Sequence, residues 1–164
     1  MAKTSFNEFL LAVAPEHRVF VEKLNDKLLE QGCELVIKEV KSGYTATYQL
    51  EKKTVMNWVF RKTGIWARIY GDNAGRYEEV IAALPADMQK KMTASRDCKR
   101  LIDPDACSGT CVKGFVYSLN GETQKKCRND GMLFLLTEET AEYIAGLICA
   151  EAAARKPALQ QLNR

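Results

Sequence analysis

The sequence predicts an α+β domain, in which helices and strands occupy separate stretches of the chain. Three observations support this prediction. Apolar residues recur at helical spacing in the first 32 positions, four runs of β-forming residues follow between positions 33 and 70, and helical spacing returns on both sides of a later hairpin that carries cysteines. A chain of 164 residues is long enough to bury one core. We therefore expect a single domain over residues 1–156 and a frayed tail at 157–164.

Two helices are expected before the sheet. Ser5 is a suitable N-cap for a short helix whose apolar stripe includes Phe9. Pro15 suits the first turn of a second helix, which Gly32 ends. The chain then changes to strand-forming sequence, and the connections between the runs are short enough to favour an antiparallel meander of about four strands. These strands are expected at 33–40, 44–51, 55–60 and 65–70.

The second half alternates between helix and hairpin. A central helical segment is expected over 71–95, with a break at Pro85 and with Asp72 or Asn73 as its cap. Asn120-Gly121 lies between two extended runs and is a strong signal for a two-residue hairpin turn. A short buried strand at 132–136 and a final helix over 138–156 complete the predicted order.

The composition is that of an ordinary globular protein. Hydrophobic residues make up 46% and charged residues 27%, so disorder is excluded as an overall description. The first residues lack the pattern of a secretory signal, and no apolar run approaches the length of a membrane span. We therefore expect a cytoplasmic protein with no membrane association, and thiols that remain reduced. The sequence gives no oligomeric state.

Four of the six cysteines, Cys98, Cys107, Cys111 and Cys127, lie within 30 residues of one another. Four thiolates satisfy the tetrahedral coordination of Zn²⁺, so the segment predicts a structural zinc site in a non-enzymatic domain. The spacing lacks the paired short knuckles of common zinc ribbons. Buried free thiols, a redox pair and an iron–sulfur cluster are the alternative interpretations, and a redox sensor would depend on the thiol of Cys98 beside two cations. The two remaining cysteines, Cys33 and Cys149, are expected in the core.

The basic charge of the chain is concentrated on the same segment. Residues 98–128 contain six basic and three acidic side chains, a net +3 that equals the formal charge of the whole chain. Cations beside the ligands would compensate the −2 charge of a zinc tetrathiolate centre. As an alternative, a basic hairpin that includes Lys125 and Lys126 could bind nucleic acid, although no nucleic-acid-binding motif accompanies it.

No catalytic residue set is recognisable. His17 is the single histidine and lies in the first turn of a predicted helix, where an exposed position is the default. Nucleophilic catalysis that depends on histidine would rest on this residue alone. We therefore favour a domain that is not an enzyme over one whose catalytic site is assembled from distant residues, an alternative that would leave no local motif.

A small-molecule site is predicted on one face of the sheet. Alternation places Trp66, Arg68 and Tyr70 on the same face of their strand, and Trp58 is expected to join them from the preceding strand. Such an aromatic wall with a guanidinium could hold an anionic or aromatic ligand. The alternative is a face that the terminal helices cover.

The segments "FRKTGIWARIYGDN" and "CKRLIDPDACSGTCVKGFVYSLNGETQKKCRN" resemble parts of a family of small proteins from clostridial-type bacteria. This resemblance covers roughly residues 50 to 150 and implies a bacterial cytoplasmic protein. The helical start followed by short strands is similar at the level of the fold to YdhG-like domains. Neither family implies a reaction, so the resemblance assigns no catalytic residues.

Overall fold

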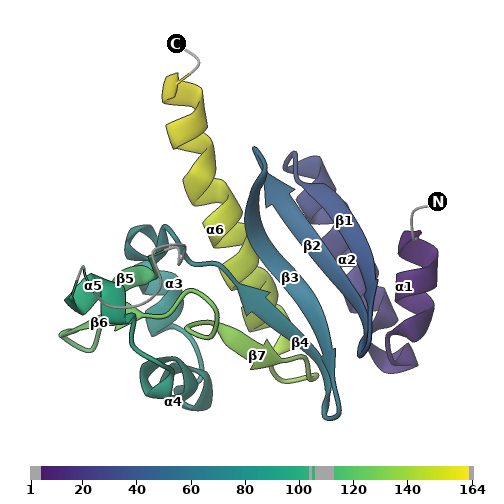
Figure 1. Ribbon diagram of the computed structural model, residues 1–164, viewed down its shortest axis with the longest axis horizontal. Coiled ribbons are helices and arrows are strands. Elements are labelled where there is room, and N and C mark those ends of the chain that lie inside the picture. Colours follow the sequence, from purple (N-terminus) through teal and green to yellow (C-terminus); the bar gives the residue numbers. More distant parts are fainter. Residues whose placement is uncertain (1–4, 104, 106–112, 163–164) are drawn as a thin grey trace.

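The computed structural model describes residues 5–103, 105 and 113–162, except for the side chains of 157–162. Helices and strands follow one another as the sequence predicts, and the domain is α+β (Figure 1). The helices are α1 (Phe6–Ala12), α2 (Pro15–Glu30), α3 (Glu78–Ala82), α4 (Ala86–Ala94), α5 (Lys99–Ile102) and α6 (Ala141–Leu162), with a 3₁₀ turn, η1, at Ala74–Arg76. The strands are β1 (Glu34–Val40), β2 (Gly43–Leu50), β3 (Lys53–Arg61), β4 (Gly64–Ile69), β5 (Phe115–Leu119), β6 (Glu122–Lys126) and β7 (Leu133–Leu135).

The main sheet has the order β1-β2-β3-β4-β7, and each neighbouring pair is antiparallel. The predicted four-strand meander is confirmed, and β7 adds a fifth strand beside β4. β5 and β6 form a separate hairpin that turns at Asn120-Gly121, where both residues have positive φ angles of 54° and 80°. These angles are those of a type I′ turn, which an Asn-Gly pair favours.

The helix ends follow local sequence signals. Ser5 and Glu8 form a capping box at the start of α1, and Pro15 is the first residue of α2. Gly32, with φ of +93°, follows α2 as expected. The predicted central helix is divided into η1, α3 and α4, with the expected break before α4 at Pro85.

The C-terminal helix is longer than predicted. We expected an end near residue 156 and a frayed tail, but α6 continues through Pro157 to Leu162. Residues with high helix propensity surround the proline, in the sequence "AEAAARKPALQQL". These residues favour continued helix although proline lacks the N–H that an interior position donates. No helix in the described part of the chain combines the length and apolarity that a membrane span requires.

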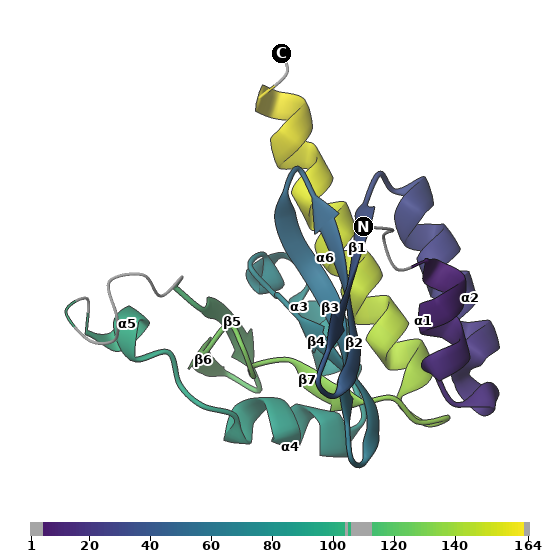
Figure 2. The same ribbon diagram turned by 45° about the vertical axis from the view of Figure 1, so that its right-hand side comes forward.

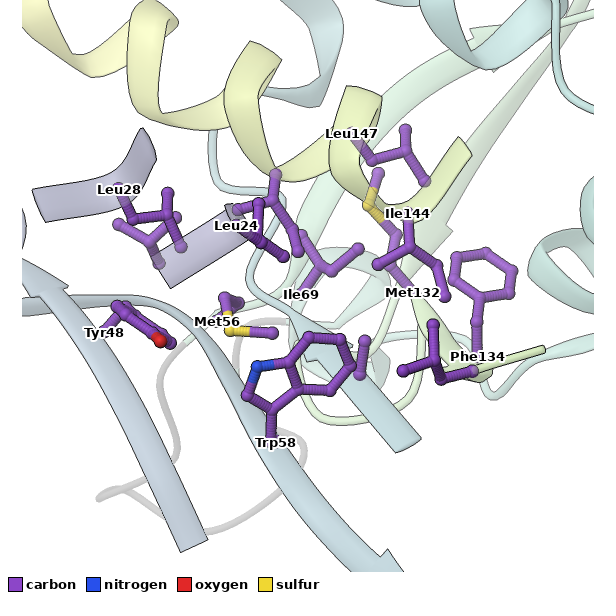
Figure 3. Packing of buried hydrophobic residues seen from close by; sticks show 14 of the residues in the cluster. Leu24, Leu28, Tyr48, Met56, Trp58, Ile69, Met132, Phe134, Ile144 and Leu147 are labelled. Atoms are coloured by element: carbon purple, nitrogen blue, oxygen red, sulfur yellow. The ribbon is translucent and has the colours of Figure 1, made fainter. Parts of the chain in front are cut away.

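The main core lies between the sheet and the helices α2 and α6. Tyr48, Met56 and Trp58 from the sheet are each 0% exposed. Figure 3 shows these side chains facing Leu24 and Leu28 of α2 and, farther along the sheet, Ile144 and Leu147 of α6. Removal of this much aromatic and aliphatic surface from water is the main source of the stability of the domain.

The β5–β6 hairpin and α4 form a second layer. Figure 2 shows them on one side of the sheet, while α1 and α2 lie on the other. The hairpin contributes Phe115, Tyr117 and Leu119 to the core by strict alternation along β5. Gly131 allows this layer to pack closely, because a Cβ at this position would lie 2.5 Å from the Phe115 ring. The hairpin is therefore part of the hydrophobic core.

Candidate functional site

Cys98 and Cys127 lie on two chain segments that a β-bridge joins. The bridge connects Asp97 with Lys126, so residues 96–98 run antiparallel to the end of β6. The backbone N–H of Cys98 donates to a carbonyl of β6 at 2.9 Å, and the N–H of Cys127 donates back to the 96–98 segment at 2.8 Å. Cys98 therefore lies one residue after the bridge on the first segment, and Cys127 lies one residue after it on the second.

The Cys98 thiol has a polar environment although the residue is only 6% exposed. Its Sγ accepts a hydrogen bond from the backbone N–H of Gly114 at 3.3 Å. Burial acts to raise the pKa of this thiol, but backbone donors from Gly114, Leu101 and Arg100, with the charge of Arg100, lower it below its ordinary value. The surroundings of Cys98 therefore favour a thiolate.

The other cysteines differ from Cys98. Burial raises the pKa of the half-buried Cys127, and the nearby Asp130 carboxylate acts in the same direction. Cys33 is buried, as expected, and Cys149 packs against the core from a partly exposed position. The two other predicted ligands, Cys107 and Cys111, lie outside the described residues. Among the residues that are described, no three His, Cys, Asp or Glu side chains are grouped closely enough to hold a metal ion.

Lys126 does not lie on an open basic surface. It is 3% exposed, and its Nζ donates to the carbonyls of Thr93 and Ser95 at 2.8 and 3.1 Å and to the Asp97 carboxylate at 2.8 Å. All three ammonium protons are therefore used to fasten β6 to the end of α4. Of the two lysines named in the alternative nucleic-acid hypothesis, only Lys125 is exposed.

The predicted aromatic face is divided between the two sides of the sheet. The register pairs Trp58 with Ala67 and Val59 with Trp66, so Trp58 shares a face with Ala67. Trp58 is 0% exposed and belongs to the core. The expectation that it lines a ligand wall with Trp66 is therefore wrong. The physical reason is the two-residue turn between β3 and β4, which places even-numbered positions of β3 opposite odd-numbered positions of β4.

Trp66 is on the opposite face, where two cations contact its ring. The guanidinium carbon of Arg61 is 5.4 Å from the ring centroid, and Nζ of Lys91 is 4.3 Å from it. Burial, together with repulsion from Arg61, lowers the pKa of Lys91. Protein side chains thus occupy positions that a stacking ligand would need on Trp66.

Arg68 and Tyr70 also have partners within the protein. Nε of Arg68 donates to the carbonyl of Asn129 at 2.8 Å. The Arg128 guanidinium lies 4.4 Å from the centroid of the Tyr70 ring, and the Tyr70 hydroxyl accepts from Nδ2 of Asn57 at 3.3 Å. Like Trp66, both residues remain partly exposed on this face of the sheet.

A small cleft lies beside this face of the sheet, and a larger groove lies elsewhere on the surface. A cleft of about 290 Å³ lies between α4 and β7 and is lined by Lys91, Ala94, Ser95, Asp130 and Leu133. A larger groove, of about 560 Å³, lies where the α1–α2 connection meets the β3–β4 turn and the segment before α6. Its polar lining includes Glu16, His17, Arg61, Thr63 and Glu138. We expected His17 to be exposed in the first turn of a helix, and no sequence pattern predicted this groove.

A buried polar cluster at Glu151 was also missed. Glu151 is 0% exposed and accepts four hydrogen bonds. The donors are the backbone N–H and side-chain amide of Asn73 at 3.0 and 2.8 Å, the Tyr77 hydroxyl at 2.7 Å and Nε of Arg155 at 2.7 Å. We expected Asp72 or Asn73 to cap the helical segment. The Asn73 side chain makes no capping hydrogen bond and binds Glu151 of α6. The i, i+4 pair Glu151–Arg155 in an alanine-rich helix was the available signal.

The cluster extends to the surface through Arg155. This guanidinium donates to the carbonyls of Lys53 and Tyr70 at 3.3 and 3.1 Å, and it lies 3.4 Å from the Asp72 carboxylate. Asp72 accepts two further bonds from Arg128, at 3.1 and 3.2 Å. The charges of Glu151 and Asp72 are matched by Arg155 and Arg128, so the cluster joins α6, the sheet and the segment after β6.

No protein-family model, curated protein or solved structure matches this chain.

Proposed function

We propose that this chain is a non-enzymatic domain with a structural zinc site formed by Cys98, Cys107, Cys111 and Cys127. The observation that carries the proposal is the position of Cys98 and Cys127 on either side of one β-bridge. Diagonal positions across an antiparallel pair have Cβ atoms roughly 7 Å apart. Two thiolates at such positions can reach a common metal with Zn–S bonds of about 2.3 Å after small side-chain adjustments.

The environment of Cys98 supports a metal thiolate. Zinc binds the thiolate form, and the donors around this sulfur lower the pKa of Cys98. The N–H of Gly114 supplies an outer-shell hydrogen bond to the sulfur. Gly114 is also required for the close approach of the two chain segments, because a Cβ here would overlap the carbonyl oxygen of Lys126.

The proposed role of the metal is to hold the segment between α5 and β5 against the hairpin. Cys98 immediately precedes α5 and Cys127 immediately follows β6, so these two ligands bracket the segment that contains the other two. Zinc binding would add to the folding free energy of this part of the domain. The large core of the main sheet would not depend on it.

Native mass spectrometry of protein purified without chelator or histidine tag tests the proposal. We expect one zinc ion in the folded protein and its loss on unfolding. Cys98→Ser should abolish zinc retention, and Cys149→Ser, which changes a cysteine away from the hairpin, should leave one ion bound. A metal-free wild-type protein would overturn the proposal. If its thiols also reacted reversibly with oxidant in the folded state, the redox-sensor hypothesis would take its place.

We propose as a second function the binding of a small anionic molecule at the outer sheet face around Trp66, Arg68 and Tyr70. The cleft between α4 and β7 lies beside this face and is lined by the Lys91 ammonium. Lys91 lies near Arg61, and burial, together with repulsion between the two cations, lowers the pKa of Lys91. A bound anion would relieve this repulsion and raise that pKa.

A titration with inorganic phosphate, followed by tryptophan fluorescence, tests this second proposal. Arg68→Ala should weaken the response at least threefold, since a charge-assisted hydrogen bond is lost. Arg76→Ala, which removes an exposed cation outside this face, is the matched control. An identical titration for wild type and Arg68→Ala would show that Arg68 is not part of an anion site.

A further inference from the structure

β1 is an open edge of the main sheet. It pairs with β2 over seven consecutive positions without a bulge, and it contains no proline. Figure 2 shows α1 and α2 on one side of the sheet, and Figure 1 shows α1 beside the β1 end of the sheet, with no strand along the outer edge of β1. Within the described residues, no backbone hydrogen bond joins β1 to any segment other than β2. The opposite edge, β7, has only three residues. β1 is longer and regular, and exposed edge strands of this kind are templates for pairing with another strand.

The side chains of β1 leave apolar surface exposed at this edge. Val36 and Val40 on the outer face are 38% and 42% exposed. On the helix side, Leu35 and Ile37 pack against the core but remain only half-buried. An added strand would shield all four side chains from water.

We propose that β1 pairs antiparallel with β1 of a second copy, about a twofold axis at Val36. In this register Glu34 is opposite the partner's Lys38, and Lys38 is opposite the partner's Glu34. Leu35 is opposite the partner's Ile37 on the helix side, and the two Val36 residues meet at the axis. Every directly opposed pair from 34 to 38 is therefore either apolar or oppositely charged, which is the favourable combination for cross-strand neighbours.

The neighbouring register is much poorer. An axis at Ile37 would place Val36 opposite the partner's Lys38 and Leu35 opposite the partner's Glu39. It would also leave Glu34 opposite the partner's Val40. Charge complementarity thus selects both the partner, which is a copy of the same strand, and the register.

The product would be a twofold dimer with a continuous ten-strand sheet. An axis perpendicular to the sheet keeps the helices of both copies on the same side of the joined sheet as in the monomer. Few residues take part, and interfaces of this size bind weakly. We therefore expect a monomer–dimer equilibrium that depends on protein concentration in the micromolar range.

Sedimentation velocity over a series of protein concentrations tests the interface. Glu34→Lys or Lys38→Glu alone creates two like-charge pairs in each dimer and should raise the dissociation constant on the order of tenfold. The double variant, Glu34→Lys with Lys38→Glu, exchanges the charges and should restore the wild-type constant. Far-UV circular dichroism checks the fold of each of the three variants, and both positions of the cycle, Glu34 and Lys38, are exposed in the monomer.

Cysteine cross-linking tests the register independently. Val36→Cys should form an intermolecular disulfide on mild oxidation, because the two positions meet at the axis. Val40→Cys lies on the same face of the same strand with similar exposure, and it should not cross-link. A wild-type protein that is monomeric at every concentration would overturn the proposal. So would a dimer that is indifferent to the single charge changes, or equal cross-linking at positions 36 and 40.

Discussion

Replacement of Glu151 by glutamine tests whether the buried polar cluster stabilises the fold. Glutamine keeps one carbonyl oxygen for the Tyr77 hydroxyl and the Asn73 N–H, but it places an amide group against the donors of Asn73 and Arg155. The Asn73 amide can turn to accept from this new donor, whereas Nε of Arg155 cannot. One buried charged donor is then unsatisfied and a buried ion pair is lost, so we expect Glu151→Gln to reduce the unfolding free energy by about 3 kcal/mol.

Urea denaturation, followed by far-UV circular dichroism, measures this change. For a domain of this size a slope near 2 kcal/mol per molar urea converts the expected loss to a midpoint shift of about 1.5 M. Glu142→Gln is the matched control, because Glu142 lies on the same helix and is exposed; its effect should stay within about 0.5 kcal/mol. If Glu151→Gln unfolded at the wild-type urea concentration, the cluster would not contribute as its geometry indicates.

Three further substitutions, Lys126→Met, Gly114→Ala and Tyr117→Phe, test the hairpin layer, and Lys125→Met and Gly146→Ala are the comparison variants. Lys126→Met removes three buried donor contacts and should cost about 2 to 4 kcal/mol by urea denaturation, whereas the exposed Lys125→Met should change stability by less than about 0.5 kcal/mol. Gly114→Ala should destabilise the protein, because its Cβ would overlap the backbone of β6. Gly146→Ala, at a position on α6 with open space around it, should raise the melting temperature, because alanine favours the helix by about 0.5 to 1 kcal/mol over glycine. Tyr117→Phe should stabilise the protein by about 1 kcal/mol near neutral pH, because the buried hydroxyl has no partner among the described residues. Burial raises the pKa of Tyr117 to about 12 from 10.0, so the unfolded chain releases this proton more readily and the unfolding free energy falls as pH rises between those values. Stability measured against pH should fall less steeply there in the phenylalanine variant.

Local signals were sufficient to predict the order of the elements. Ser5, Pro15 and Gly32 mark helix ends through their own backbone and side-chain preferences. Asn120-Gly121 specifies a tight turn because both residues tolerate positive φ. The antiparallel meander followed from the short connections alone. None of these features depends on contacts between distant parts of the chain.

The division of the sheet between core and surface was harder to predict. Trp58 and Trp66 are the same residue type, so their chemistry does not indicate which of them lies on the side of the sheet that the helices cover. The two-residue connection between β3 and β4 nevertheless contains the answer. It requires Trp58 to oppose an odd-numbered residue of β4, so Trp58 and Trp66 must lie on opposite faces. The prediction failed because alternation was applied to each strand separately, without the register that the turn imposes.

The basic segment shows why charge counts do not locate a binding surface. Lys125 and Lys126 are adjacent and have the same charge, yet one is exposed and the other is buried against three acceptors. Alternation along β6 directs successive side chains to opposite faces, and only the position of α4 determines which face is covered. Burial of Lys126 is tolerable because the two carbonyls that end α4 and the carboxylate of Asp97 replace its water ligands. The lysine therefore joins two elements that are distant in the sequence, a role that depends on tertiary structure and that leaves no local pattern.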